Sequence, residues 1–117
     1  MAFRETLLDD DSRNSRKILK SCLPEDQEHG VYEADGGQEG LSKFSEANPG
    51  VTFLDVNMPA MGGIRCLEEI KKIDEKAIII MCTANVQSKA VLKAAALGAI
   101  AISRKPLSKD AVRDVLN

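Results

Sequence analysis

The sequence lacks tryptophan, and its aromatic side chains are limited to three phenylalanines and one tyrosine. So few rings disfavour a site that stacks against nucleic-acid bases or sugars. Basic residues are not in excess either, because 16 Lys and Arg accompany 18 Asp and Glu, for a formal net charge of −2. We therefore expect no direct binding of nucleic acid.

Long apolar runs are also missing. The longest, Ala77 to Cys82, is far too short to span a bilayer. The first residues, Met-Ala-Phe-Arg-Glu-Thr, lack the apolar stretch of a signal peptide. We expect no membrane insertion and a cytoplasmic location.

Cysteine and histidine are scarce. Cys22, Cys66 and Cys82 are odd in number and widely spaced, which indicates small core residues in a reducing compartment, with disulfides and metal binding disfavoured. The single histidine, His29, has no second imidazole with which to form a metal site or a catalytic triad.

The 117 residues have an apolar content of 44%, which is typical of one globular domain, and we assign residues 1–117 to a single domain. Short apolar runs alternate with segments of helical periodicity. Strands are predicted at 5–8, 31–34, 51–54, 77–82 and 99–103, and helices at 12–23, 38–47, 64–73, 87–97 and 108–117. This alternation predicts a parallel sheet with helices on both faces.

Charged and polar residues follow the predicted strands. Asp9 to Asp11 follow the first strand, Asp55 the third, Thr83 the fourth and Lys105 the fifth. Parallel strands end at one rim, where crowded carboxylates repel one another unless a cation joins them, and Mg²⁺ suits such oxygen ligands. The hydroxyl and ammonium groups suit a phosphoryl group, which an Asp carboxylate can accept as an acyl phosphate.

Four segments in this order resemble the receiver domain of two-component response regulators, of the stand-alone CheY-like type. They are DDSRNSRKILKSCL from Asp10, FLDVNMPAMGG around Asp55, MCTA around Thr83 and the GA…KP pattern of 98–106. The resemblance covers almost the whole chain. It implies a flavodoxin-like (CheY-like) three-layer α/β/α fold, with five parallel strands in the order 2-1-3-4-5 and five helices. It also implies a phosphorylation-dependent switch, with chemotaxis as one setting.

The resemblance implies a role for each matching residue. Asp55 is the expected phosphoacceptor, Thr83 is expected to bond a phosphoryl oxygen, and Lys105 to neutralise another; the bond from Lys105 to Pro106 is often cis in this family. The expected magnesium ligands are Asp10, Asp11, Asp55 and the backbone carbonyl of Asn57. We expect no turnover beyond self-catalysed phosphoryl transfer and autodephosphorylation.

Partners also follow from the resemblance. A sensor histidine kinase is the expected phosphodonor. A downstream target is expected to bind the fourth helix, the fifth strand and the last helix. A monomer or a weak dimer is expected.

Four departures from the family pattern stand out. Asp9 replaces an apolar residue and makes a run of three acids, so that it must reach solvent, contact Lys105 or destabilise the fold. Ile102 replaces the aromatic residue that accompanies the threonine in switching, and Gly62 replaces an Asp or Asn. The last helix is short, as in a receiver excised from a longer regulator.

Simpler interpretations exist for each residue. Asp9 to Asp11 can be a solvated helix N-terminus, Asp55 can cap a turn, Thr83 can satisfy its own backbone and Lys105 can be a surface lysine. Taken together, these residues favour a common site.

Three other classes of function compete. An aspartate-nucleophile phosphohydrolase usually has a second acid two residues after the nucleophile, where this chain has Asn57. A phosphorylation-independent binding module is compatible with Asp9, Gly62 and Ile102. A flavodoxin-like nucleotide-binding protein is disfavoured because no glycine-rich loop follows the first strand.

Overall fold

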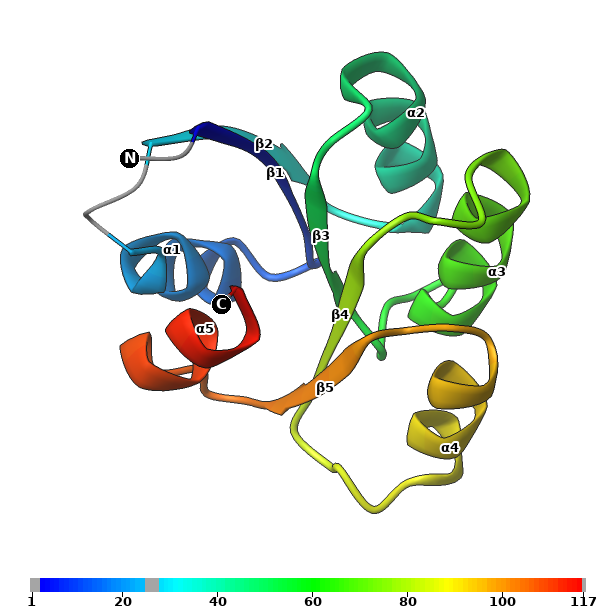
Figure 1. Ribbon diagram of the computed structural model, residues 1–117. Helices are drawn as coiled ribbons and strands as arrows, with labels where there is room; N and C mark the ends of the chain where they lie inside the picture. The colour runs from blue at the N-terminus through cyan, green and yellow to red at the C-terminus, as the bar shows by residue number, and fades with distance from the viewer. Residues whose placement is uncertain (1–2, 25–27, 117) are drawn as a thin grey trace.

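The computed structural model describes residues 3–24 and 28–116. The strands are β1 (Phe3–Asp9), β2 (Glu28–Ala34), β3 (Val51–Asp55), β4 (Ile79–Thr83) and β5 (Ala101–Arg104). The helices are α1 (Arg13–Cys22), α2 (Gly37–Ala47), α3 (Gly63–Ile73), α4 (Lys89–Ala96) and α5 (Lys109–Leu116). The predicted alternation of strands and helices is confirmed (Figure 1).

All strand pairs are parallel, and the sheet order β2-β1-β3-β4-β5 confirms the prediction. β1 lies between β2 and β3, and β3 lies between β1 and β4. The order therefore brings the carboxyl ends of β1 and β3 side by side, with the end of β4 next in line.

Helices cover both faces of the sheet. α1 and α5 lie on one face, and α2, α3 and α4 lie on the other (Figure 1). Because side chains alternate along a strand, Leu8 packs with the α1 and α5 side while its neighbour Leu7 packs with the α2 and α3 side. The three cysteines are buried and free, which confirms the prediction that they are core residues.

Several predicted boundaries were wrong. Residues 28–30 were expected to belong to a loop, yet they extend β2, because β1 begins at Phe3 and offers them partners. The expected strand at 77–82 starts two residues later, and Ile78 is 44% exposed although it was expected to be covered. Ile73 is 53% exposed at the end of its helix. Local patterns do not show where a neighbouring strand begins or a helix stops covering the sheet.

Within residues 3–24 and 28–116, no helix is long and apolar enough to cross a membrane. The longest have 11 residues, about 17 Å at 1.5 Å per residue. The predicted end of the last helix at Asn117 lies outside the described residues.

Thr52 in β3 is buried, and its hydroxyl oxygen has no hydrogen-bond partner. A buried hydroxyl without a partner costs about 1–3 kcal/mol. Thr52→Val keeps the shape and removes the orphaned oxygen, so we expect the free energy of unfolding to rise by about 1 kcal/mol in denaturant titrations. Thr6→Val in β1 is the matched control, because Thr6 is equally buried but has a partner; an equal gain in both variants would contradict the explanation.

A candidate metal centre at the carboxyl edge of the sheet

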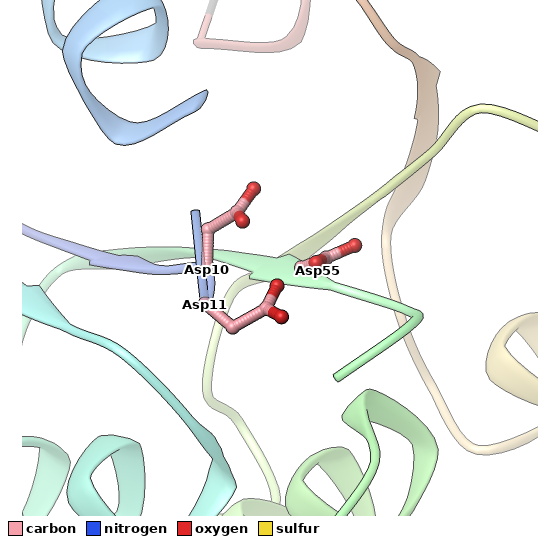
Figure 2. Close-up of side chains that lie close together, drawn as sticks. All are labelled: Asp10, Asp11 and Asp55. Atoms are coloured by element: carbon pink, nitrogen blue, oxygen red, sulfur yellow. The ribbon is translucent and has the colours of Figure 1, made fainter. Parts of the chain in front are cut away.

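Three carboxyl groups meet where β1 and β3 end. Asp10 and Asp11 follow the last residue of β1, and Asp55 is the last residue of β3. Figure 2 shows their side chains extending from the two strand ends into the same region. Each offers one oxygen, and these oxygens lie within 4.8 Å of one another. Such an all-oxygen set fits Mg²⁺, which takes one or two carboxylates and keeps several of its waters.

Lys105, directly after β5, joins the cluster. Its Nζ lies 2.6 Å from Asp10 Oδ2 and 3.2 Å from Asp55 Oδ1. Burial lowers the pKa of Lys105, but the hydrogen bond and charge of Asp10, together with those of Asp55, outweigh burial and raise the pKa above its usual value. The bond from Lys105 to Pro106 is cis, as expected for the family. Lys105 is thus a fixed positive charge beside Asp55, and not a free surface lysine.

The surroundings of Asp55 disfavour the ionised form of its carboxyl group. Burial, and then the charge of Asp10, raises the pKa of Asp55 to about 6, although Lys105 and the backbone amide of Asn57 act in the opposite direction. The Asn57 amide donates to Asp55 Oδ1 over 3.2 Å. A cation bound beside Asp55 would stabilise its carboxylate, since positive charge favours the ionised form.

The start of α1 holds Asp10 in place. Ser12 caps the helix by accepting from the Ser15 amide, and the Ser12 amide donates to Asp10 Oδ1 over 2.9 Å. Arg16 donates from Nη1 to the Asp10 carbonyl over 2.6 Å and pairs with Glu33 over 3.0 Å. The role of Arg16 was not predicted.

Thr83 ends β4, the strand next to β3. Its hydroxyl accepts from the Asn85 amide over 3.1 Å and donates to the Asn85 carbonyl over 3.4 Å. The hydroxyl therefore satisfies its own loop in this structure, as the simpler interpretation described. Contact with a group on Asp55 requires the hydroxyl to leave Asn85.

Close approach between α3 and β3 depends on a glycine. A Cβ on Gly63 would lie 2.0 Å from the Asp55 carbonyl oxygen. The Gly63 amide donates to the Val56 carbonyl over 3.1 Å. Gly62, one of the departures, occupies the N-cap position and provides no side-chain cap. The α3 terminus is thus packed directly behind the phosphoacceptor candidate.

Asp9 neither reaches solvent nor contacts Lys105. It is 1% exposed, and Lys105 binds Asp10 and Asp55 instead. One Asp9 oxygen, Oδ1, has no hydrogen-bond partner, and the other lies 3.8 Å from Cys66 Sγ. Burial raises the pKa of Asp9 to about 7, against the opposing effect of the Gly36 amide. Of the three possibilities, the structure supports destabilisation of the fold.

Gly40 in α2 makes room for the Asp9 carboxyl group. A Cβ on Gly40 would lie 1.8 Å from Asp9 Oδ2. Cys66 in α3 closes the same space, and burial, followed by the nearby Asp9 charge, raises the pKa of its thiol to about 12. Neither neighbour was predicted, since they become neighbours of Asp9 only through the packing of α2 and α3 on the sheet.

The predicted site residues are therefore largely brought together. The structure groups Asp10, Asp11, Asp55 and Lys105, and it places Asn57 and Thr83 at the adjoining loop and strand end. Ile102 is partly buried against the core on the α2, α3 and α4 side.

Known proteins resemble this chain over most of its length. Residues 6–117 match the response regulator receiver domain family. The chain is 38% identical to the chemotaxis protein CheY of Bacillus subtilis, over all of this chain and 97% of the relative. It is 36% identical to CheY of Halobacterium salinarum, over 97% of this chain and 94% of that protein. The structure is also similar to a chain in the crystal structure of the CheX–CheY–BeF3–Mg+2 complex from Borrelia burgdorferi. The superposition covers 96% of this chain and 85% of that chain, with a TM-score of 0.86 and 29% sequence identity.

Proposed function

This chain belongs to the response regulator receiver domain family and acts in phosphorylation-dependent two-component signalling, and on that premise we propose that Asp55 is its phosphoacceptor. The observation that supports this choice is the convergence of three carboxyl groups and Lys105 on one edge of the sheet. Of the three acids, Asp55 is the one at the end of the central strand β3.

The residues present fit a divalent cation of the Mg²⁺ type. We assign Asp10, Asp11, Asp55 and the backbone carbonyl of Asn57 as its ligands. When bound, Mg²⁺ supplies positive charge that offsets the carboxylates and the transferring phosphoryl group. The Borrelia relative was crystallised with BeF3 and Mg, which is in line with this assignment.

Phosphoryl transfer then needs little from the protein beyond positioning and charge. An Asp55 oxygen attacks the phosphorus of a phosphohistidine on a sensor histidine kinase. The phosphorus–nitrogen bond breaks, its electron pair remains on the imidazole, and an acyl phosphate forms on Asp55. Lys105, whose Nζ lies 3.2 Å from Asp55 Oδ1, would neutralise a phosphoryl oxygen.

The switch in this proposal is the Thr83 hydroxyl. In the structure it is bonded to Asn85. A phosphoryl oxygen on Asp55 offers a charged acceptor, which forms stronger hydrogen bonds than a neutral carbonyl. Thr83 would then turn towards Asp55 and release the loop after β4, shifting a two-state equilibrium.

We place the target-binding surface on α4, β5 and α5. Leu92 on α4 is 75% exposed, and a groove beside β5 is lined by Ile102, Arg104, Ser108 and Val115. α4 begins directly after the loop that Thr83 would release, and β5 pairs with β4, the strand that Thr83 ends. We further propose that the protein acts in the cytoplasm, in keeping with its buried free cysteines. We also propose that it acts as a monomer or weak dimer.

Incubation with acetyl phosphate tests the proposal directly. We expect intact mass spectrometry to show one phosphoryl adduct in the presence of Mg²⁺, and little or none when EDTA removes the metal. The adduct should be labile to alkali, as an acyl phosphate is. Absence of an adduct under every condition would contradict the proposal and would favour a binding module that works without phosphorylation.

A further inference from the structure

A cavity of about 220 Å³ opens beside the acidic cluster, between α1, the ends of β3 and β4, and the segment after β5. Its apolar walls are formed by Ile18, Leu19, Phe53, Cys82, Pro106 and Leu107. An apolar protein cavity of about 150 Å³ has room for benzene. This cavity is larger, so a six-membered ring fits within it.

The polar end of the cavity is negatively charged. Asp10, Asp55 and Lys105 line it, and the Asp11 carboxyl group lies within 4.8 Å of the other two acids. Lys105 pairs with Asp10 and Asp55, and Asp11 adds a third carboxyl group to the same cluster, so negative charge exceeds positive charge there when these groups are ionised. A ligand that enters the cavity with its charged end at this position is therefore favoured if that end is a cation.

We propose that this cavity binds a small primary amine that carries one six-membered ring or an alkyl group of similar bulk. The ring packs against Leu19, Phe53 and Leu107, where burial of apolar surface stabilises it. The ammonium group lies against Asp10 and Asp55. The two ends of the ligand thus match the two ends of the cavity.

Binding of such an amine has a consequence for signalling, which rests on the proposed function. The ammonium group and Mg²⁺ use the same carboxylates, Asp10 and Asp55. Two ligands that need the same site exclude each other, so the amine slows Mg²⁺-dependent phosphorylation and added Mg²⁺ reverses the inhibition. The amine would act as a negative regulator of the receiver.

Binding is tested with benzylamine as the probe and benzyl alcohol as a neutral control of equal size. Titrations of the full chain in EDTA are followed by amide chemical shifts. We expect saturable shifts around Leu19, Phe53 and Leu107 with benzylamine, and about tenfold weaker binding of benzyl alcohol, the ratio that a partly buried charge pair of about 1.4 kcal/mol produces. Equal affinities, or no saturable shift, would overturn the proposal.

Variants locate the site. Leu107→Phe fills the cavity and is expected to weaken benzylamine binding at least about tenfold, since overpacked apolar space no longer accepts a ring. Ile73→Phe, at the exposed end of α3, is the matched control and should bind as the unaltered chain does. If Leu107→Phe fails to fold, Ile18→Phe at the partly exposed rim replaces it. Unchanged binding in the cavity variant would overturn the proposal.

Competition separates this proposal from the phosphoacceptor assignment. Mg²⁺ is expected to raise the apparent dissociation constant of benzylamine, and an affinity that does not respond to Mg²⁺ would refute the shared use of Asp10 and Asp55. If the protein forms the acyl phosphate normally but does not bind benzylamine, only the cavity proposal is rejected. Benzylamine binding without any acyl phosphate rejects the phosphoacceptor assignment alone.

Discussion

Asp55→Asn is expected to abolish the phosphoryl adduct from acetyl phosphate completely, while the protein remains folded. An amide cannot act as the nucleophile that forms an acyl phosphate. The fold should persist because Asn has the same size, and because Lys105 keeps its 2.6 Å contact with Asp10 Oδ2. Burial and the charge of Asp10 raise the pKa of Asp55 to about 6, so removing its charge should leave the melting temperature at pH 8 equal or higher.

The measurement is intact mass after incubation with acetyl phosphate and Mg²⁺, combined with a thermal melt. Asp35→Asn is the matched control, since Asp35 follows β2 at the same edge of the sheet but is exposed and lies outside the cluster. The control should be labelled as fully as the unaltered chain. Stoichiometric labelling of the Asp55→Asn protein would mean that another residue accepts the phosphoryl group.

Asp9→Val is expected to increase the free energy of unfolding by about 2–4 kcal/mol at pH 8. Asp9 is 1% exposed and one of its carboxyl oxygens lacks a partner, and a buried charge without a partner is strongly unfavourable. A β-branched apolar residue suits a buried strand position. The gain should appear in denaturant titrations and in the melting temperature.

The gain should also depend on pH. Burial raises the pKa of Asp9 from its ordinary 3.8 to about 7. Below pH 3.8 both the folded and the unfolded states hold the proton. Between pH 3.8 and 7 the unfolded state releases it while the folded state retains it, so the unaltered protein loses stability as the pH rises through this window. Asp9→Val has no such loss, and its advantage should be smaller at pH 4.5 than at pH 8. A gain that does not change with pH would show that Asp9 is not buried as an acid.

Gly40 provides the structural control for Asp9. With Asp9 present, Gly40→Ala places a methyl group 1.8 Å from Asp9 Oδ2 and should lower the stability by about 1–3 kcal/mol through overpacking. In an Asp9→Ala background the same change should raise it by about 1 kcal/mol, because Ala favours a helix over Gly. Gly62→Ala, whose Cβ would come no closer than 3.8 Å to the neighbouring atoms, should have the same effect in both backgrounds. Equal effects of Gly40→Ala in both backgrounds would contradict the contact.

The chemistry of the site was predictable because it depends on residues at strand ends. A buried apolar run followed by an acid marks the carboxyl end of a strand, and parallel strands bring such ends to one edge. Strand ends alone predict that the Asp9–Asp11 run, Asp55 and Lys105 meet at this edge, and Lys105 Nζ lies 2.6 Å from Asp10 Oδ2 and 3.2 Å from Asp55 Oδ1. Boundaries were less predictable, as the extension of β2 by residues 28–30 shows, because pairing partners far along the chain decide them.

The environment of Asp9 could not be predicted in this way. The sequence shows three consecutive acids, and only the pleat of β1 decides that Asp10 reaches Lys105 while Asp9 points into the core towards Cys66. The same holds for the hydroxyl of Thr83, which has two possible partners and in the structure is bonded to Asn85.

By itself, the sequence determined the order of strands and helices, the parallel α/β class and the set of residues at the acidic edge, because hydrophobic periodicity and strand-end residues are local properties of the chain. Only the tertiary structure decided which carboxyl groups are buried, how Gly40 accommodates Asp9, and that an apolar cavity adjoins the acids. Burial, close contact and cavities arise from side chains that are distant in sequence and meet only when helices pack on the sheet.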